Sequence, residues 1–266
     1  GYQTNFLDIE VALPTVEGST ILPNQNFTTV FNRERKLAFF SALNYQHPFN
    51  RGRDGRFHRD GRVGDDQVEN NLYRNNAWDR GHLAARRFVD WGDNADAGDR
   101  DSFLWTNIVP MHKNMHTSAG REWSAMEDHL ENIAANNSKD RKLTMFVGCI
   151  FLDDDLTLNA NAGSNLVVDD DDVTDYDEVK VPQFFWAIGV WINRFSNRLN
   201  SVGFLIENYR PDLTGNGGPI DYNLTDSFST TADRVPVRDI SLWTGINLDD
   251  GVIEADIFRV PSVPRN

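Results

Sequence analysis

The stretch "PQFFWAIGVWIN", from Pro182 to Asn193, decides the fold class of this sequence. It is an apolar and aromatic run between polar ends, which is typical of a strand buried in the core of a sheet. A helix that spans a bilayer needs roughly 20 apolar residues, and no run in the chain approaches that length. We therefore expect a core strand here and no membrane segment.

Similar runs elsewhere predict the other strands of the sheet. Core strands are expected at Lys142–Phe151 and Ser201–Asn208, and a shorter strand at Phe103–Pro110, which the proline ends. The segment Phe27–Asn44 has two apolar runs around a polar centre, which predicts a hairpin. Residues 1–24 are interpreted as an extended lead-in and residues 51–71 as a loop.

Two helices are predicted from the spacing of apolar residues. In Gly120–Asn137 a buried stripe recurs at steps of three and four residues, made by Trp123, Met126, Leu130 and Ile133. A closing helix is expected at Val237–Ile246. The sequence has no repeat, heptad pattern or evident linker, so it predicts a single α+β domain over residues 1–266. We expect a central antiparallel sheet flanked by helices.

The chain is acidic, with 26 Lys and Arg against 40 Asp and Glu and a formal net charge of −14. Its charges are unevenly spread: Arg51–Arg62 holds five arginines and two aspartates, whereas Asp169–Glu178 holds seven acids and no base. One face can then attract a polyanion while the rest of the surface repels it. The acidic run is interpreted as a solubilising loop, with a calcium site as the alternative. Cys149 is the only cysteine, which excludes an internal disulfide.

The motif "DRGH" (Asp79–His82) carries residue types suited to the cleavage of a phosphodiester. This reaction needs an activated water, neutralised charge on the phosphoryl oxygens and a stabilised leaving oxyanion. A neutral imidazole serves the first need, a guanidinium the second and a divalent cation the third. Candidate ligands for a cation follow in the segment 106–131: Asn107, His112, Asn114, His116, Glu127, Asp128 and His129.

"DRGHL", then "TNIVP" from Thr106 and "EWSAMED" from Glu122, stand in the order and at distances similar to those of the DNA/RNA non-specific endonucleases. The chain resembles this ββα-metal (His-Me finger) class, which includes endonuclease G, over roughly residues 27–260. The resemblance implies a ββα-metal motif at the site and a metal-dependent cleavage of DNA and RNA that leaves 5′-phosphates. It also implies a divalent ion, Mg²⁺ or Mn²⁺, as the cofactor.

The resemblance assigns roles to matching positions. His82 matches the general base, Arg80 the arginine that contacts phosphate, and Asn107 the asparagine that helps to organise the site. Glu127 matches a helix carboxylate that binds metal-bound water. Arg56 is our choice for the loop arginine at the scissile phosphate, in competition with Arg53, Arg59 and Arg62.

One position departs from the family pattern. The asparagine that binds metal in the family lies nine residues after the asparagine of the "TN" motif, and here that count from Asn107 reaches His116. Three interpretations are open: His116 is the ligand, Asn114 takes its place, or the metal site is degenerate. An imidazole ligand would favour Mn²⁺ or another transition metal over Mg²⁺.

Residues around the motif have structural interpretations as well. Asp79 is expected to anchor the turn by hydrogen bonds. For Arg86 and Arg87, a phosphate contact and a solvated patch are both open. His112 and His129 are expected to be structural or exposed, and Asp128 to lie on the helix surface.

We expect DNA and RNA as substrates, and the resemblance alone suggests a homodimer. The sequence does not disclose whether an inhibitor protein is a partner. The alternative function is a nucleic-acid or polyanion-binding module that keeps the fold with weakened catalysis. A calcium-stabilised extracellular protein that uses the acidic run is a third hypothesis. Residue 1 is glycine and no leader-like segment is visible, so we expect a processed chain, secreted or periplasmic by analogy with the family.

Overall fold

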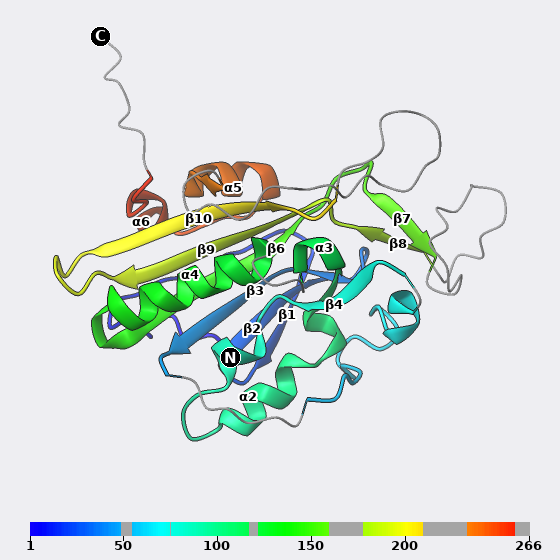
Figure 1. The fold of residues 1–266 in the computed structure, drawn as a ribbon, viewed down its shortest axis with the longest axis horizontal. Coiled ribbons are helices and arrows are strands. Elements are labelled where there is room, and N and C mark those ends of the chain that lie inside the picture. Colours follow the sequence, from blue (N-terminus) through cyan, green and yellow to red (C-terminus); the bar gives the residue numbers. More distant parts are fainter. Residues whose placement is uncertain (49–54, 75, 117–121, 160–177, 210–232, 259–266) are drawn as a thin grey trace, which may run out of the picture.

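A large antiparallel sheet organises the computed structural model, which describes residues 1–48, 55–74, 76–116, 122–159, 178–209 and 233–258. Within these ranges the sheet has seven strands in the order β1-β2-β3-β6-β9-β10-β11 (Figure 1). Their bounds are Ser19–Asn24 (β1), Phe27–Asn32 (β2), Leu37–Gln46 (β3), Lys142–Ile150 (β6), Phe184–Ile192 (β9), Leu199–Glu207 (β10) and Arg234–Val235 (β11). The long central strands β3, β6 and β9 are almost wholly buried, because apolar elements cover both faces.

Helices and short strands cover the two faces. On one face lie α4 (Glu122–Asn136), α1 (Arg86–Val89) and a separate pair of strands, β4 (Trp78–His82) and β5 (Ile108–His112). On the other face, α5 (Val237–Thr244) and α6 (Asp250–Glu254) pack with the N-terminal residues Phe6 and Leu7. The remaining elements are α2 (Ala95–Ser102), α3 (Lys113–His116), β7 (Leu156–Asn159), β8 (Glu178–Val181) and the 3-10 turns Asn70–Tyr73, Trp105–Asn107 and Lys139–Arg141.

Helix α4 packs closely on the sheet through its apolar stripe. The stripe of Trp123, Met126 and Leu130 is buried, as the spacing predicts. The helix comes near β9 at Gly189, where a Cβ atom would lie 2.6 Å from Leu130 Cδ2. The missing side chain therefore lets α4 lie against the strand.

Most of the predicted elements are confirmed, with small shifts at their ends. These are the hairpin of β2 and β3, the core strands β6, β9 and β10, and the helices α4 and α5. None of the described helices is long and apolar enough to cross a membrane. Residues 169–177 of the acidic run and Arg53 lie outside the described residues.

Two expectations are wrong. Residues 19–24 are no lead-in, because they form β1 and pair with β2 at the edge of the sheet. The strand predicted at Phe103–Pro110 begins only at Ile108 and continues through Pro110 to His112. Pro110 does not end it, since β5 pairs with a single neighbour and a proline is tolerated where no ladder hydrogen bond is needed.

Candidate active site

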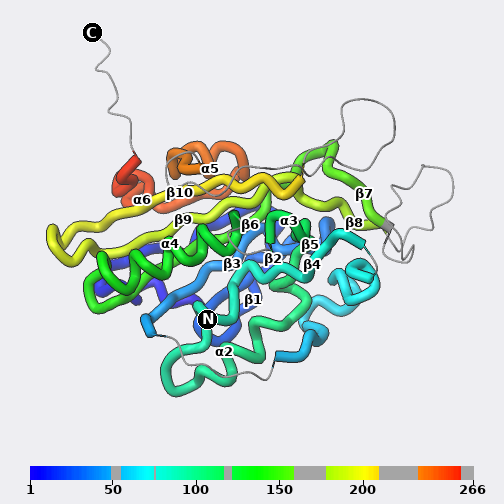
Figure 2. The backbone as a smooth tube through the Cα atoms, in the orientation of Figure 1, coloured from blue at the N-terminus to red at the C-terminus, as the bar shows by residue number. Residues whose placement is uncertain are grey.

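The strands β4 and β5 carry the "DRGH" motif on the face of the sheet that α4 covers (Figure 2). They pair antiparallel, with Trp78 opposite His112 and His82 opposite Ile108. The chain enters α1 just after His82, and it enters α3 just after His112. The antiparallel pairing thus brings the motif close to α3, which carries Asn114 and His116.

His82 sits in an aromatic enclosure. Its ring centroid lies 4.9 Å from that of Phe103 and 5.7 Å from that of Phe57, which in turn stacks on Trp105 at 4.9 Å. Burial lowers the pKa of His82 to about 3, and His116, Arg86 and Arg80 add to the effect. In the described part of the chain, the buried Nε2 atom has no hydrogen-bond partner. His82 is therefore an uncharged imidazole at neutral pH.

Arg80, two residues before His82 on the same strand, is exposed. Its guanidinium lies 4.6 Å from the ring centroid of Phe57 and donates to Asn70 Oδ1 at 3.2 Å. Among the described residues, no carboxylate pairs with it. An arginine held by an aromatic ring and an amide, with no acidic partner, is well suited to receive an anionic group.

The loop arginines differ in their partners. Arg59 pairs with Asp65 at 2.5 Å and Glu69 at 3.2 Å, and Arg62 pairs with the buried Asp60 at 2.6 Å. Arg56 is exposed, and within the described ranges its side chain forms no ion pair. Of the three described loop arginines, it is the one that stays available for a phosphate.

Asn107 is fully buried and holds the turn that follows His82. Its Oδ1 accepts from the backbone N–H of Ala84 and the hydroxyl of Ser41, both at 2.9 Å. Its Nδ2 donates to the carbonyls of Ala84 at 3.0 Å and Ser102 at 2.9 Å. With both ends of its amide engaged, Asn107 organises the backbone beside His82.

His116 faces the first residue of the motif. Its Nδ1 lies 3.2 Å from Asp79 Oδ2. Because a carboxylate can only accept, Nδ1 carries the proton and Nε2 keeps a free lone pair for a metal ion. Burial lowers the pKa of His116, although Asp79 opposes the shift. Asp79 was expected to anchor a turn, and the structure pairs it with this histidine.

Asn114 and His112, two further candidate ligands, lie close to each other beside the motif. The backbone N–H of Asn114 donates to His112 Nδ1 at 3.2 Å. His112 is buried against Trp78, and burial lowers its pKa to about 4. Among the described residues, no three His, Cys, Asp or Glu side chains gather closely enough to hold a metal ion. A cation at His116 would thus keep several waters in its shell, as Mg²⁺ and similar ions commonly do.

Glu127 lies on α4 with both carboxylate oxygens engaged. Oε1 accepts from Trp123 Nε1 at 3.0 Å, and Oε2 pairs with an Arg87 nitrogen at 3.1 Å. Burial raises the pKa of Glu127 to about 7, and Arg87 opposes this. The carboxyl group is therefore held in a fixed position.

Arg86 and Arg87 form no solvated patch, since both are bound to acids. Arg86 lies 3.6 Å from Asp90 and 3.5 Å from Asp99, while Arg87 pairs with acids of α4. His129 packs on Phe204, and Asp128 is exposed on α4, as expected. The sequence interpretation missed the enclosure of Phe57, Phe103 and Trp105. The phenylalanine in the otherwise polar loop 55–62 was the one available signal.

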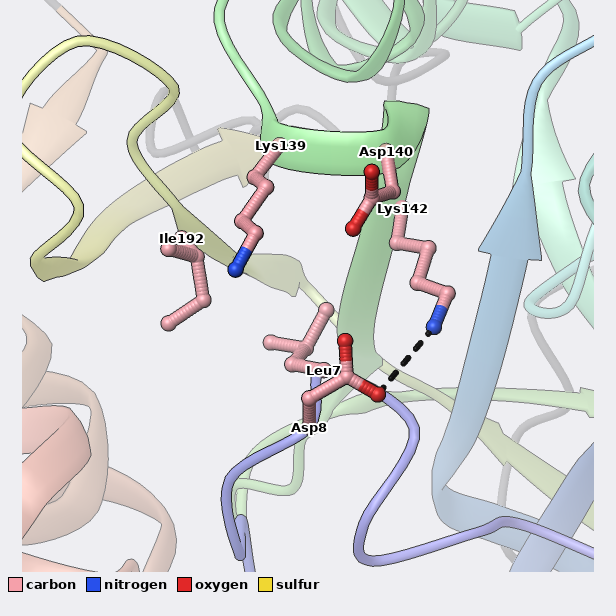
Figure 3. Close-up of a pocket in the computed structure, with 6 residues that line it drawn as sticks. All are labelled: Leu7, Asp8, Lys139, Asp140, Lys142 and Ile192. Atoms are coloured by element: carbon pink, nitrogen blue, oxygen red, sulfur yellow. Dashed lines mark ion pairs between the residues drawn. The ribbon is translucent and has the colours of Figure 1, made fainter.

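A surface depression and a cavity lie away from β4 and β5. One is a shallow depression near the N-terminal segment, where Lys142 pairs with Asp8 at 3.5 Å (Figure 3). The other is a cavity of about 260 Å³ beside α5, lined by residues that include Arg35, Phe151 and Trp243. Neither contains a residue of the motif.

Comparisons with known proteins identify the family and support the fold. The chain is 28% identical to the uncharacterized protein y4fB of Sinorhizobium fredii (strain NBRC 101917 / NGR234), and the match covers all of this chain and 41% of that protein. It spans less than half the length of that relative. A crystal structure of an EndoG/EndoGI complex, described as showing the mechanism of EndoG inhibition, contains a chain with a TM-score of 0.61 at 14% identity. That match covers 91% of this chain and 89% of the other, and it supports the fold. A model of the DNA/RNA non-specific endonuclease family matches residues 9–255, and the chain belongs to this family.

Proposed function

We propose that this chain is a metal-dependent endonuclease that hydrolyses phosphodiester bonds of DNA and RNA with little sequence preference and leaves 5′-phosphates. The observation that carries the proposal is the presence, on one strand, of an uncharged His82 and of an Arg80 that has no acidic partner among the described residues. Family membership supports the same activity.

In the proposed reaction, the uncharged imidazole of His82 accepts a proton from the attacking water. A phosphate bound beside the ring raises the basicity of His82, because the negative charge favours the imidazolium. Arg80 and Arg56 bind the non-bridging oxygens, and Asn107 keeps the backbone next to His82 in place. Contacts to phosphate carry no base information, which accounts for the low sequence preference.

The metal ion belongs beside His116. The Asp79 contact leaves Nε2 of His116 as a donor, and this chemistry fits a first-row divalent ion such as Mn²⁺ better than Mg²⁺. A bound divalent ion would stabilise the leaving 3′-oxygen. Asn114 stays as the alternative ligand. Glu127 would orient water close to the ion.

A plasmid-nicking assay with Mn²⁺ and with Mg²⁺ tests the proposed activity. We expect cleavage by the wild type and a loss of about 10²- to 10⁴-fold in His82→Ala, the range for a general base. His129→Gln, which changes a histidine of α4 that packs on Phe204, should cleave normally. Cleavage unchanged in His82→Ala would contradict the proposal. Binding of DNA without cleavage by the wild type would identify a binding module instead.

The metal ligand is tested separately with His116→Asn. We expect weaker Mn²⁺ binding by calorimetry and a metal preference shifted toward Mg²⁺, because an amide oxygen replaces a nitrogen. If affinity and preference both stay unchanged, His116 is not the ligand. The same measurement on Asn114→Ala then tests the alternative.

A further inference from the structure

Arg87 follows the "DRGH" motif closely, yet its guanidinium points to three carboxylates of α4. It lies 3.1 Å from Glu127, 2.6 Å from Asp128 and 3.4 Å from Glu131. The Arg87 side chain is 24% exposed, and the Glu127 side chain is 13% exposed. Both terminal nitrogens are occupied, so Arg87 has little capacity left for a phosphate.

The acids around Arg87 depend on its charge. Asp128 and Glu131 stand one and four residues after Glu127, on neighbouring positions of the same helix. Without Arg87, three carboxylates would lie close together, and the buried one would take up a proton first. Glu127 would then keep only the contact with Trp123.

The network extends beyond α4. Glu131 lies 3.8 Å from His47 Nδ1, and the Tyr45 hydroxyl lies 3.0 Å from the same nitrogen. Among the described residues, the charged and titratable groups that face Glu127 and Glu131 are therefore Arg87 of α1, Asp128 of α4, and Tyr45 and His47 at the end of β3. Arg87 is the central cation of this network, and it joins α1 to α4.

We propose that Arg87 is a positioning residue for hydrolysis: through its ion pair it holds the Glu127 carboxylate in place, and it does not contact the substrate. This inference rests on the proposed function, because it gives Glu127 its task beside the metal. A positioning role explains why Arg87, an arginine near the motif, is surrounded by three carboxylates. The residue connects the helix after His82 to the helix that follows the metal ligand.

Kinetics distinguish positioning from phosphate binding. We expect Arg87→Gln to lower kcat about 10- to 100-fold, the usual effect of losing an outer-shell partner, with KM and its salt dependence unchanged. Arg87→Lys should recover part of the loss. The control is Arg100→Gln, since Arg100 is exposed and pairs with the adjacent Asp101. If Arg87→Gln raises KM and lowers the slope of log KM against log salt concentration by about one, Arg87 contacts a phosphate and the proposal is overturned.

A second readout requires no catalysis. The ¹³Cδ signal of Glu127 is followed against pH in the wild type and in Arg87→Gln, in protein labelled at glutamate. We expect the midpoint to rise by at least about one pH unit without Arg87, and to move back in Arg87→Gln/Glu131→Gln, which removes a like charge. An unchanged midpoint would overturn the inference.

The two readouts fail independently. If the wild type does not cleave nucleic acid while the Glu127 midpoint shifts, the proposed function is wrong and the role of Arg87 toward Glu127 stands. If Arg87→Gln does not fold, Arg87→Lys and Arg87→Gln/Glu131→Gln give the same comparison with less unbalanced charge.

Discussion

His82 shows how an environment sets the state of one residue. Phe57 and Phe103 shield part of the ring from water, and no described acid lies against it to favour the charged form. The imidazole therefore stays neutral far below its ordinary pKa of about 6.5. An uncharged His82 can accept a proton, but its low pKa makes it a weak base until a phosphate binds beside it.

The low pKa of His82 predicts a pH-dependent stability. The unfolded chain takes up a proton near pH 6.5, whereas the folded chain resists protonation down to about pH 3. The folded state thus loses stability as the pH falls through this window, by about 2 kcal/mol between pH 6.5 and 4.5. Over the same pH range, the free energy of unfolding of His82→Gln, measured with urea, should fall by about 2 kcal/mol less than that of the wild type. Equal losses in the two proteins would mean that the ring is solvated.

Asn107 illustrates how an element is held in place. The spacing of "TN" and "DRGH" suggested that Asn107 belongs to the site, but sequence alone could not reveal four hydrogen bonds to residues 41, 84 and 102. These bonds also explain why the predicted strand at 103–110 starts late. Residues 105–107 form a 3-10 turn that directs the amide inward, so strand pairing begins at Ile108.

Asn107→Ala should loosen the turn after His82. Removal of the amide leaves a buried N–H and buried carbonyls without partners, which costs about 2 to 4 kcal/mol. Chemical denaturation measures the change in the free energy of unfolding. Asn136→Ala, an exposed residue at the end of α4, serves as the control and should change stability by less than about 0.5 kcal/mol. A similar small effect for both variants would show that water replaces the Asn107 amide.

At the scale of the whole molecule, periodicity predicted most of the sheet and α4, because a buried strand or helix face leaves a pattern in the chain. The pattern missed β1, β4 and the short helices, whose stability comes from tertiary contacts. It also could not foresee which arginines meet acids. Arg86, Arg87, Arg59 and Arg62 are paired, whereas Arg80 and Arg56 have no acidic partner among the described residues.

The uneven charge of the molecule predicts that its affinity for DNA depends only weakly on salt concentration, and that a few arginines account for this dependence. Of the described arginines in the motif and its preceding loop, Arg80 and Arg56 have no acidic partner, and with a net charge of −14 we expect few phosphates to be contacted at once. Binding of a DNA duplex in EDTA, followed by fluorescence anisotropy, should show a slope near −2 in log K against log salt, at about 0.9 per contact. Arg80→Gln should reduce the slope by about one contact. Arg33→Gln, whose arginine pairs with Asp66, should not change it; an equal reduction in both would mean diffuse attraction.

The central claim is that a divalent ion at His116 and the imidazole of His82 act on the same phosphate. Anomalous diffraction from crystals soaked with Mn²⁺ and a phosphorothioate oligonucleotide tests this directly. We expect one manganese bonded to Nε2 of His116, with a phosphate between it and His82. Manganese bound elsewhere, or a phosphate out of reach of His82, would contradict the account.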